Sequence, residues 1–292
     1  MKRLILALAP EGSYGHQAAA IAKSLLEPEY GELSIEFRTA NADVPASALY
    51  EQCFAVAPIT NNTEGPVWEV IRKFWLQQKD GVPIYVIGEI NLPIHHSLLA
   101  HPSIKSISEI TAVASYTNAL GQCRENLSRL GIGIETQTKS TAAAAKIVRD
   151  NPEMRTTAAI ASKFAGEIYG LKVLQERVED SPDNVTRFHI LGPTPRFPTG
   201  KDRTALFYWI QDKPGAQHDA TEAFKVYEIN MSDTFSIRVG KIIVFYCEAE
   251  FHRDTDSGRK ALDMMRTKTD RLFILGSYPQ EIDEGEEVNS GT

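Results

Sequence analysis

Short apolar segments alternate with longer amphipathic segments through the first 170 residues of the chain. Residues 4–9 (LILALA) and 54–59 (FAVAPI) are near-continuous apolar runs, which are typical of strands buried on both faces of a sheet. Residues 16–26 and 67–76 instead repeat their apolar side chains at helical spacing. The alternation predicts an α/β fold with largely parallel sheets. Further strands are predicted at 33–40, 83–92, 111–115 and 158–162, and further helices at 46–52, 118–130, 140–149 and 164–169.

The predicted elements fall into two successive blocks, which we interpret as two lobes that face a cleft. Lobe 1 is expected to comprise about residues 1–80 plus 178–191, and lobe 2 about residues 81–177. The alternation ends at residues 191–200 (LGPTPRFPTG), where three prolines and two glycines give the composition of a linker. We therefore expect a linker over residues 192–202.

A different order of elements follows the linker. Residues 203–280 contain strand, helix, strand, strand, helix and strand, which is the pattern of a small ferredoxin-like domain. The chain has 292 residues, more than the ~100–150 of a typical domain, so its length accommodates an additional domain. Residues 281–292 hold five acidic residues and few apolar ones, and we expect this tail to be disordered. The strands of the last domain are predicted at 204–210, 229–237, 241–251 and 271–278, and its helices at 216–226 and 257–265.

The composition argues against several classes of partner. The chain has 31 basic and 38 acidic residues, a net charge of −7 and a pI of about 5.6, so we expect neither a nucleic acid nor an anionic membrane as partner. Lys2 and Arg3 precede only a short apolar run, below the ~7–15 residues of a signal peptide, which favours a first buried strand.

The three cysteines are widely spaced, and free thiols in a reducing cytoplasm are their expected state (Cys53, Cys123 and Cys247). The histidines also lack metal-ligand spacing, so no metal and no cofactor are predicted.

Two polar segments of lobe 1 connect a predicted strand to a predicted helix. Residues 9–19 (APEGSYGHQAA) contain Ser13 in a glycine-containing turn, where free backbone N–H groups and the positive end of a helix favour an anion. Residues 57–67 (APITNNTEGPV) bring Asn61 and Asn62 to the carboxyl end of a strand, where ligands bind in open α/β sheets. The alternative for both segments is turn and capping chemistry without a ligand.

Lobe 2 contains two similar segments. Ser115 and Asn118 lie at the junction of a predicted strand and a predicted helix, and Ser140 and Thr141 are natural N-caps of the alanine-rich helix that follows them. Several helix N-termini that meet at one cleft would suit a polyanionic small molecule. Each segment alone is also consistent with helix capping.

A fourth polar segment lies at residues 179–192 (EDSPDNVTRFHILG). Because side chains alternate along a strand, Thr186 and Phe188 are expected on one face and Arg187 on the other. An arginine in a strand can bind a carboxylate through two parallel hydrogen bonds, and a neighbouring threonine hydroxyl can donate to a leaving group. A solvent-facing arginine beside an edge strand is the alternative.

These segments, in this order, resemble the prephenate dehydratases of phenylalanine biosynthesis, from about residue 4 to Pro279. The resemblance rests on PEGSYGHQAA (10–19), PITNNTEGPV (58–67), IGEINLPIHHSLL (87–99), ASYTNALGQCRENL (114–127), STAAAA (140–145), AAIAS (158–162), YGLKVL (169–174) and NVTRFHILG (184–192). The last domain looks like the ACT domain that follows the catalytic part in this family, on the basis of KPGA (213–216), YEINMS (227–232) and LGSYP (275–279).

The resemblance implies a two-lobed catalytic domain over residues 1–191, shaped like a periplasmic binding protein, and an ACT regulatory domain over 203–280. It also implies the conversion of prephenate to phenylpyruvate with loss of water and carbon dioxide. In that reaction Thr186 would donate to the departing hydroxyl, Arg187 would anchor a carboxylate and Phe188 would shape the pocket. The other implied roles are prephenate binding by Ser13, Asn61, Asn62, Ser115, Asn118, Ser140 and Thr141, amino-acid effector binding at Gly215, Ala216 and Asn230, and assembly into a dimer or tetramer.

The chain departs from the family pattern in each part. Thr60 and Asn62 stand where the family has a glutamate and a serine, and residues 115–118 read Ser-Tyr-Thr-Asn instead of Ser-His-Pro-Gln. In the last domain, residues 215–217 read Gly-Ala-Gln instead of Gly-Ala-Leu, and residues 235–238 read Phe-Ser-Ile-Arg instead of Glu-Ser-Arg-Pro. The first two departures bear on the rate or the exact substrate, and those in the last domain bear on feedback by phenylalanine. Two alternatives stay open: a non-aromatising prephenate decarboxylase of specialised metabolism, which the retained Thr186 disfavours, and a non-catalytic sensor that binds metabolites.

Overall fold

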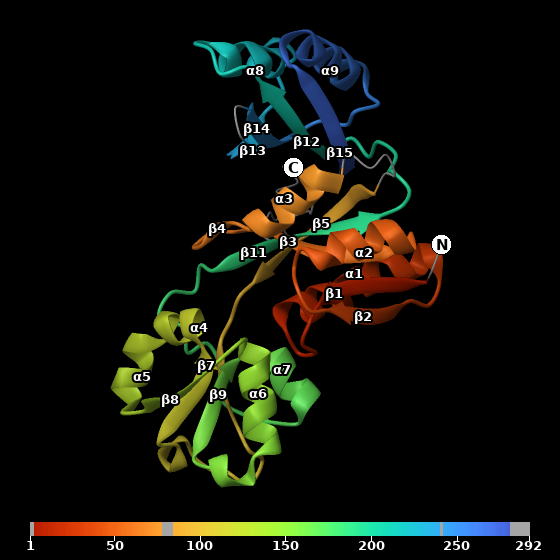
Figure 1. The fold of residues 1–292 in the computed structure, drawn as a ribbon. Helices are drawn as coiled ribbons and strands as arrows, with labels where there is room; N and C mark the ends of the chain where they lie inside the picture. The colour runs from red at the N-terminus through yellow and green to blue at the C-terminus, as the bar shows by residue number, and fades with distance from the viewer. Residues whose placement is uncertain (1–2, 78–83, 240–241, 281–292) are drawn as a thin grey trace, which may run out of the picture.

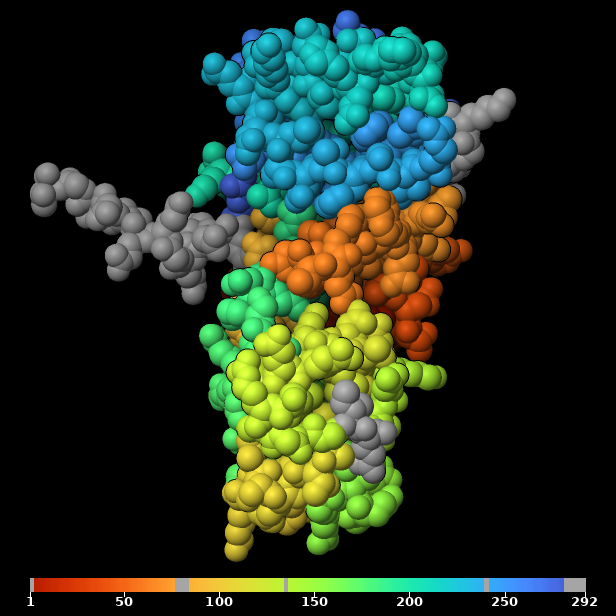
Figure 2. Space-filling view, turned by 90° about the vertical axis from the view of Figure 1, so that its left-hand side faces the viewer, coloured from red at the N-terminus to blue at the C-terminus, as the bar shows by residue number. Residues whose placement is uncertain are grey.

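Three bodies stacked in a row make up the protein (Figures 1 and 2). The structure is a computed structural model that describes residues 3–77, 84–239 and 242–280. Lobe 1 lies in the middle, lobe 2 lies at one end, and the domain formed by residues 202–279, called the third domain below, lies at the other end. The tail 281–292, for which disorder is predicted, lies outside the described residues.

Lobe 1 is built on a mixed sheet. Its elements are β1 Leu4–Leu8, α1 Tyr14–Tyr30, β2 Ser34–Arg38, α2 Asp43–Glu51, β3 Phe54–Asn61, β4 Gly65–Pro66, α3 Trp68–Gln77, β5 Tyr85–Pro93 and β11 Val185–Gly192. The strand order is β2-β1-β3-β11-β5, and the short β4 pairs with β3. Strands β1, β2 and β3 run parallel, as the apolar runs predict, whereas β11 is antiparallel to both of its neighbours.

Lobe 2 has a separate five-stranded sheet of order β10-β6-β9-β7-β8. Its elements are β6 Ser97–Ala100, β7 Ala112–Tyr116, α4 Thr117–Gln122, α5 Arg124–Leu130, β8 Gly133–Thr138, α6 Thr141–Asp150, β9 Thr157–Ala161, α7 Lys163–Tyr169 and β10 Lys172–Gln175, with 3-10 turns at Ile107–Glu109 and Pro152–Met154. The single helix predicted over 118–130 is two helices, because the backbone leaves helical geometry at Cys123 (φ −114°, ψ 8°).

The structure corrects the predicted lobe boundary. The predicted boundary places the strand at 83–92 in lobe 2, but β5 is an edge strand of the lobe 1 sheet and pairs with β11 along its length. The chain crosses to lobe 2 only after β5 and returns before β11. The two crossing segments, 94–96 and 176–184, are hydrogen-bonded to each other through Ile94 N to Asn184 O (2.7 Å) and Val178 N to His96 O (2.8 Å).

The third domain has the predicted β-α-β-β-α-β order. Its elements are β12 Asp202–Ile210, α8 Ala216–Val226, β13 Met231–Val239, β14 Ile242–Ala249, α9 Asp256–Lys268 and β15 Arg271–Pro279. The antiparallel sheet has the order β13-β14-β12-β15, which is that of ferredoxin-like folds. Both helices cover the face turned away from lobe 1 (Figure 1).

The inner face of the third-domain sheet packs on lobe 1. Trp75 of α3 makes edge-to-face contacts with the rings of Phe207 and Trp209 of β12, at ring-centroid distances of 5.8 and 4.5 Å. These residues belong to one apolar cluster that continues from lobe 1 into the third domain. No helix in the described part of the chain is long and apolar enough to cross a membrane.

Candidate active site

A cavity of about 410 Å³ lies between the two lobes. It is bordered by the first turns of α1, α4 and α6, by the ends of β1 and β3, by β11 and by the crossing segments. The residues predicted for the site from sequence that do line this cavity are Ser13, Asn61, Asn118, Ser140, Thr141, Thr186 and Phe188. They come from distant parts of the chain, and the predicted convergence of polar segments on one cleft is therefore observed.

Thr186 and Phe188 face the cavity from the same side of β11. Thr186 lies opposite Asn61 of β3, and Asn61 Nδ2 donates a hydrogen bond to Thr186 Oγ1 (2.9 Å). This bond uses a lone pair of the hydroxyl oxygen, and none of the described residues accepts the hydroxyl hydrogen. The Thr186 hydroxyl is thus left to donate to a group in the cavity.

Further hydrogen bonds hold Asn61 in place. Its Nδ2 also donates to Asn184 Oδ1 (2.7 Å), while its Oδ1 accepts from the backbone N–H groups of Thr63 and Glu64 (2.9 Å each). Asn184 is buried and lies on the crossing segment before β11. Both amide groups are therefore fixed before any ligand binds, which favours pre-organised recognition.

The polar lining continues into the first crossing segment, residues 94–96, which contains His96. His96 Nε2 lies 2.9 Å from Gln122 Oε1, and His96 Nδ1 lies 3.0 Å from the Tyr14 hydroxyl. Burial lowers the pKa of His96, so the ring is neutral at pH 7, and burial together with the nearby charge of Glu179 raises the pKa of Tyr14. This part of the wall therefore offers donors and acceptors without a net charge.

Positive potential enters the cavity from two helix N-termini and one lysine. Ser13 caps α1 by accepting from His16 N, and Ser140 caps α6 by accepting from Ala143 N (3.1 Å each). The first turn of each helix leaves N–H groups without intrahelical partners, and the helix dipole favours an anion there. Lys139 directly precedes the α6 cap and supplies the formal positive charge among the described lining residues.

A hydrogen bond joins the two lobes at the rim of the cavity. Asn118 Nδ2, from α4 of lobe 2, donates to Glu64 Oε1 of lobe 1 (2.7 Å). Both residues are exposed and both line the cavity. The contact therefore lies where a ligand would enter.

Two predicted substrate ligands have structural roles instead. Asn62 does not line the cavity, because its Oδ1 accepts from Val185 N (2.9 Å) and its Nδ2 donates to Asp183 O. Ser115 is fully buried and donates to Ile160 O (2.6 Å). The first residue ties the loop after β3 to β11, and the second ties β7 to β9.

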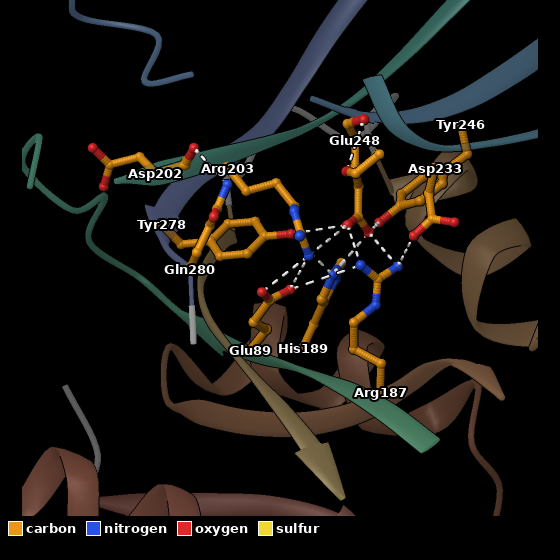
Figure 3. Close-up of polar contacts among 11 residues, drawn as sticks. Glu89, Arg187, His189, Asp202, Arg203, Asp233, Tyr246, Glu248, Tyr278 and Gln280 are labelled. Carbon is orange, nitrogen blue, oxygen red and sulfur yellow. Dashed lines mark hydrogen bonds and ion pairs between the residues drawn. The ribbon is translucent and has the colours of Figure 1, made fainter. Parts of the chain in front are cut away.

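Arg187, the predicted carboxylate anchor, does not reach the cavity either. Strand alternation places it on the opposite face of β11 from Thr186, where its guanidinium binds Glu248 (2.7 Å) and Asp233 (2.6 Å) of the third domain (Figure 3). The carboxylates that Arg187 anchors therefore belong to the protein itself. This position removes Arg187 from the candidate substrate-binding residues.

The cavity also contains side chains that were not among the predicted site residues. His96, Gln122, Asn184 and Lys139 all line it. No role is predicted for His96 from sequence, because the histidines lack metal-ligand spacing, and Gln122 and Asn184 carry no local signal. Lys139 was detectable, because it directly precedes a helix cap that was itself predicted to face an anion.

Of the three residues predicted to bind an effector, two lie together in the third domain and one lies apart from them. Gly215, at φ +80° in the left-handed region, and Ala216 line a surface hollow of about 270 Å³ at the start of α8. Asn230 lies outside this hollow, and its carbonyl accepts from Glu250 N (2.8 Å). Their effector role stays a prediction. Within the residues that the structure describes, no group of three or more His, Cys, Asp or Glu side chains is arranged to hold a metal ion.

Comparison with known proteins identifies the family. The prephenate dehydratase family model matches residues 5–196. The chain is 33% identical over 282 residues to a bifunctional chorismate mutase/prephenate dehydratase of Stutzerimonas stutzeri, covering 94% of this chain and 73% of the relative. It is 31% identical to a prephenate dehydratase of Methanocaldococcus jannaschii, covering 96% and 99%. The crystal structure of the Arthrobacter aurescens prephenate dehydratase in complex with L-Phe is similar in fold, with a TM-score of 0.79 at 24% identity over 94% of this chain and 89% of that one. The chain belongs to the prephenate dehydratase family.

Proposed function

We propose that this protein is a prephenate dehydratase, a lyase that converts prephenate to phenylpyruvate with loss of water and carbon dioxide. The observation that carries the proposal is the Thr186 hydroxyl. It accepts from Asn61 at 2.9 Å and keeps its own hydrogen available to the cavity. That is the arrangement required of a donor to a departing hydroxyl group.

The reaction removes two groups from opposite ends of the prephenate ring. As the ring carboxylate leaves as carbon dioxide, the electron pair of its C–C bond enters the ring, and the C–O bond of the ring hydroxyl breaks. The hydroxyl oxygen keeps that bond's electron pair, gains one proton that ultimately comes from solvent, and departs as water. Aromatisation supplies the driving force, so the protein contributes orientation and a hydrogen bond to the leaving oxygen.

The charge distribution of the cavity fits such a substrate. The side-chain carboxylate of prephenate would lie near Lys139 and the N-termini of α1 and α6, where positive potential is concentrated. The hydroxyl end of the ring would lie near Asn61 and Thr186, with Phe188 against the ring. In a protein of net charge −7, only such local potential attracts a dianion.

Thr186→Ala tests the proposal, with Thr186→Ser as the matched control. Removal of the hydroxyl is expected to lower kcat about 10²- to 10⁴-fold, the range typical of a lost acid–base partner, whereas serine keeps the donor and most of the activity. The measurement is phenylpyruvate formation from prephenate, with circular dichroism as the check on folding. An alanine variant with the kcat of the unmodified protein would remove Thr186 from the mechanism.

The same assay separates the two alternative functions. A non-aromatising decarboxylase would release carbon dioxide and give a product without an aromatic absorption spectrum. A metabolite sensor would bind prephenate and leave it unconverted. Prompt formation of phenylpyruvate at neutral pH excludes both alternatives.

The third domain belongs to the proposal as an ACT-like regulatory domain. The hollow at Gly215 and Ala216 is the candidate place for an amino-acid effector. Phe235 and Ile237 instead pack against the core shared with lobe 1, so we expect a weak response of turnover to phenylalanine. We also propose assembly into a dimer or tetramer, which light scattering would test, and a cytoplasmic location, which the three buried free thiols support.

A further inference from the structure

The structure points to a second use of β11, on the face turned away from the cavity. We propose that Arg187 is a positioning residue that couples Thr186 to the third domain, so that the placement of that domain sets the placement of the catalytic hydroxyl. This inference rests on the proposed function, because it assigns Arg187 a part in the same reaction. It does not require Arg187 to touch the substrate.

The contacts of Arg187 cross the boundary between lobe 1 and the third domain. Its Nη1 donates to Glu248 Oε2 (2.7 Å), and its Nη2 donates to Asp233 Oδ2 (2.6 Å) and to Glu248 Oε1 (3.2 Å). Glu248 lies on β14 and is fully buried, and Asp233 lies on the edge strand β13. One guanidinium therefore binds carboxylates on two strands of the third domain, in a fork geometry that lysine could not reproduce.

A second ion pair crosses the same boundary, with its arginine on the third domain and its carboxylate on lobe 1. Arg203 of β12 donates through Nη1 to both carboxylate oxygens of Glu89 on β5, at 3.0 and 2.8 Å. His189 of β11 adds a contact from Nε2 to Glu248 Oε1 (3.1 Å). Figure 3 shows these side chains, with Tyr278 and Tyr246, converging from β5 and β11 on one side and from β12, β13, β14 and β15 on the other. We call Glu89, Arg187, His189, Arg203, Asp233 and Glu248 the ionic cluster.

The ionic cluster is a costly way to join two domains. Its centre is removed from water, with Arg187 only 7% exposed and Glu248 not exposed at all, whereas the Asp233 side chain at its edge is 32% exposed. Three of its buried nitrogen atoms, Arg187 Nε, Arg203 Nε and His189 Nδ1, have no hydrogen-bond partner in the described structure. A buried network that is partly satisfied is a poor source of stability compared with an apolar contact. We therefore infer that the ionic cluster fixes the position of the third domain on lobe 1 more than it adds to the stability of the boundary.

The ladder between β11 and β3 has an irregularity next to Arg187, while β11 stays in register with β5 from Val185 to Ile190. The pairing of β11 with β3 is regular except for a register shift between Arg187 and Phe188. Such irregularities re-aim side chains beside active sites. Thr186 lies just before this shift, in which Ile59 of β3 is the residue without a partner on β11, and the Arg187 fork holds the backbone of β11 beside it. A displacement of about 1 Å at a catalytic group is enough to slow a reaction strongly.

Asp233→Asn provides the main test, because it weakens the fork from the third domain and changes nothing in the cavity. The matched control is Asp263→Asn on α9, which removes an exposed contact of the same kind and length, Arg266 Nη1 to Asp263 Oδ1 (2.6 Å). We expect Asp233→Asn to lower kcat about tenfold with little change in KM, and Asp263→Asn to leave both parameters unchanged. A kcat for Asp233→Asn within twofold of the unmodified protein overturns the proposal.

Arg187→Lys and the double variant with Asp233→Asn make the test specific. Because both changes break the same fork, the double variant should lose no more than the stronger single variant. Additive losses overturn the direct coupling, since they would mean two independent effects. Thermal unfolding of each variant defines an assay temperature at which all of them are folded.

The outcome also separates this inference from the proposed function. If the unmodified protein does not convert prephenate, the proposed function fails, and the coupling is read from hydrogen exchange of the backbone amides of residues 185–188. Faster exchange there in Asp233→Asn than in Asp263→Asn supports the coupling. Equal exchange in the two variants overturns it.

Discussion

Lobe 1 meets its two neighbours in opposite ways. Its boundary with the third domain contains an apolar cluster that runs through both bodies, together with the ionic cluster. Its boundary with lobe 2 contains the cavity, two crossing segments and side-chain hydrogen bonds, and the apolar clusters of lobe 2 contain only residues within 98–178. Lobe 1 is thus more firmly joined to the third domain than to the other half of the cleft.

This difference indicates which parts move together. A hinge of two backbone segments with a polar boundary permits closure around a ligand, whereas a continuous core resists it. We therefore expect lobe 2 to move against a unit made of lobe 1 and the third domain. In that unit the third domain remains in contact with β11 whatever the position of lobe 2, and β11 carries Thr186.

The largest effect is expected from Trp75→Ala, which removes the centre of the shared core. Trp75 is 6% exposed and contacts the aromatic rings of Phe207, Trp209 and Phe273 across the boundary. The loss should lower the free energy of unfolding by about 3–5 kcal/mol, as is typical of a large aromatic side chain removed from a core. Urea unfolding followed by circular dichroism measures this change.

The exposed Tyr50 supplies the control for that experiment. Tyr50 lies on α2 of the same lobe and is 93% exposed, so Tyr50→Ala should leave stability nearly unchanged. If Trp75→Ala were as stable as Tyr50→Ala, the two bodies would not share a core. Lobe 1 would then be no more firmly joined to the third domain than to lobe 2.

The cavity could be predicted from sequence to the extent that its residues follow strand ends and begin helices. Ser13, Asn61, Ser140 and Thr141 were found in this way, because their positions are set by local structure. Arg187 was misplaced because the resemblance assigned a role to Thr186, Arg187 and Phe188 together, although alternation puts the middle residue on the other face. Its true partners lie 46 and 61 residues away, and nothing local to β11 indicates them.

The same reasoning explains the error in the lobe boundary. An apolar strand such as β5 carries no mark of the sheet that it will join, and its assignment to lobe 1 depends on pairing with β11, far along the chain. His96 was overlooked for a related reason. A histidine in an apolar segment is usually structural, and only the long-range contacts with Tyr14 and Gln122 bring it to the cavity wall.

Acid should loosen the third-domain boundary without titrating the hydrogen bonds of Asn61, Asn184 and Thr186 in the cleft. Burial alone would raise the pKa of Glu248, but hydrogen bonding to His189 and the charge of Arg187 outweigh it and lower that pKa to about 2, from an ordinary 4.5. Because this pKa is lower in the folded protein than in the unfolded chain, the ionised carboxylate stabilises the folded state above pH 4.5. That stabilisation is lost as the pH falls toward 2. The contribution is about 3 kcal/mol, from ~1.4 kcal/mol per pKa unit. The amides and hydroxyls of Asn61, Asn184 and Thr186 do not titrate in this range.

Glu248→Gln isolates that titration. The variant should be less stable at pH 7, because Arg187 loses a charged partner, but its stability should fall less steeply between pH 4.5 and pH 2. Urea unfolding at a series of pH values measures both slopes. If stability fell equally steeply with pH in the two proteins, other carboxyl groups would determine the loss of stability in acid.

The smallest effect is expected at the boundary with lobe 2. Asn118→Ala removes the hydrogen bond to Glu64 that joins the lobes at the cavity rim, and an exposed bond of this kind contributes about 1 kcal/mol. Because the bond holds the two lobes together, its loss should lower the fraction of molecules in the closed arrangement. We therefore expect KM for prephenate to rise about fivefold, with kcat nearly unchanged. Thr117→Ala is the control, since the Thr117 hydroxyl bonds to Gln137 within lobe 2 (3.2 Å). A fall in kcat as large as that of Thr186→Ala would instead place Asn118 in contact with the reacting atoms, and the rim would then be part of the catalytic centre.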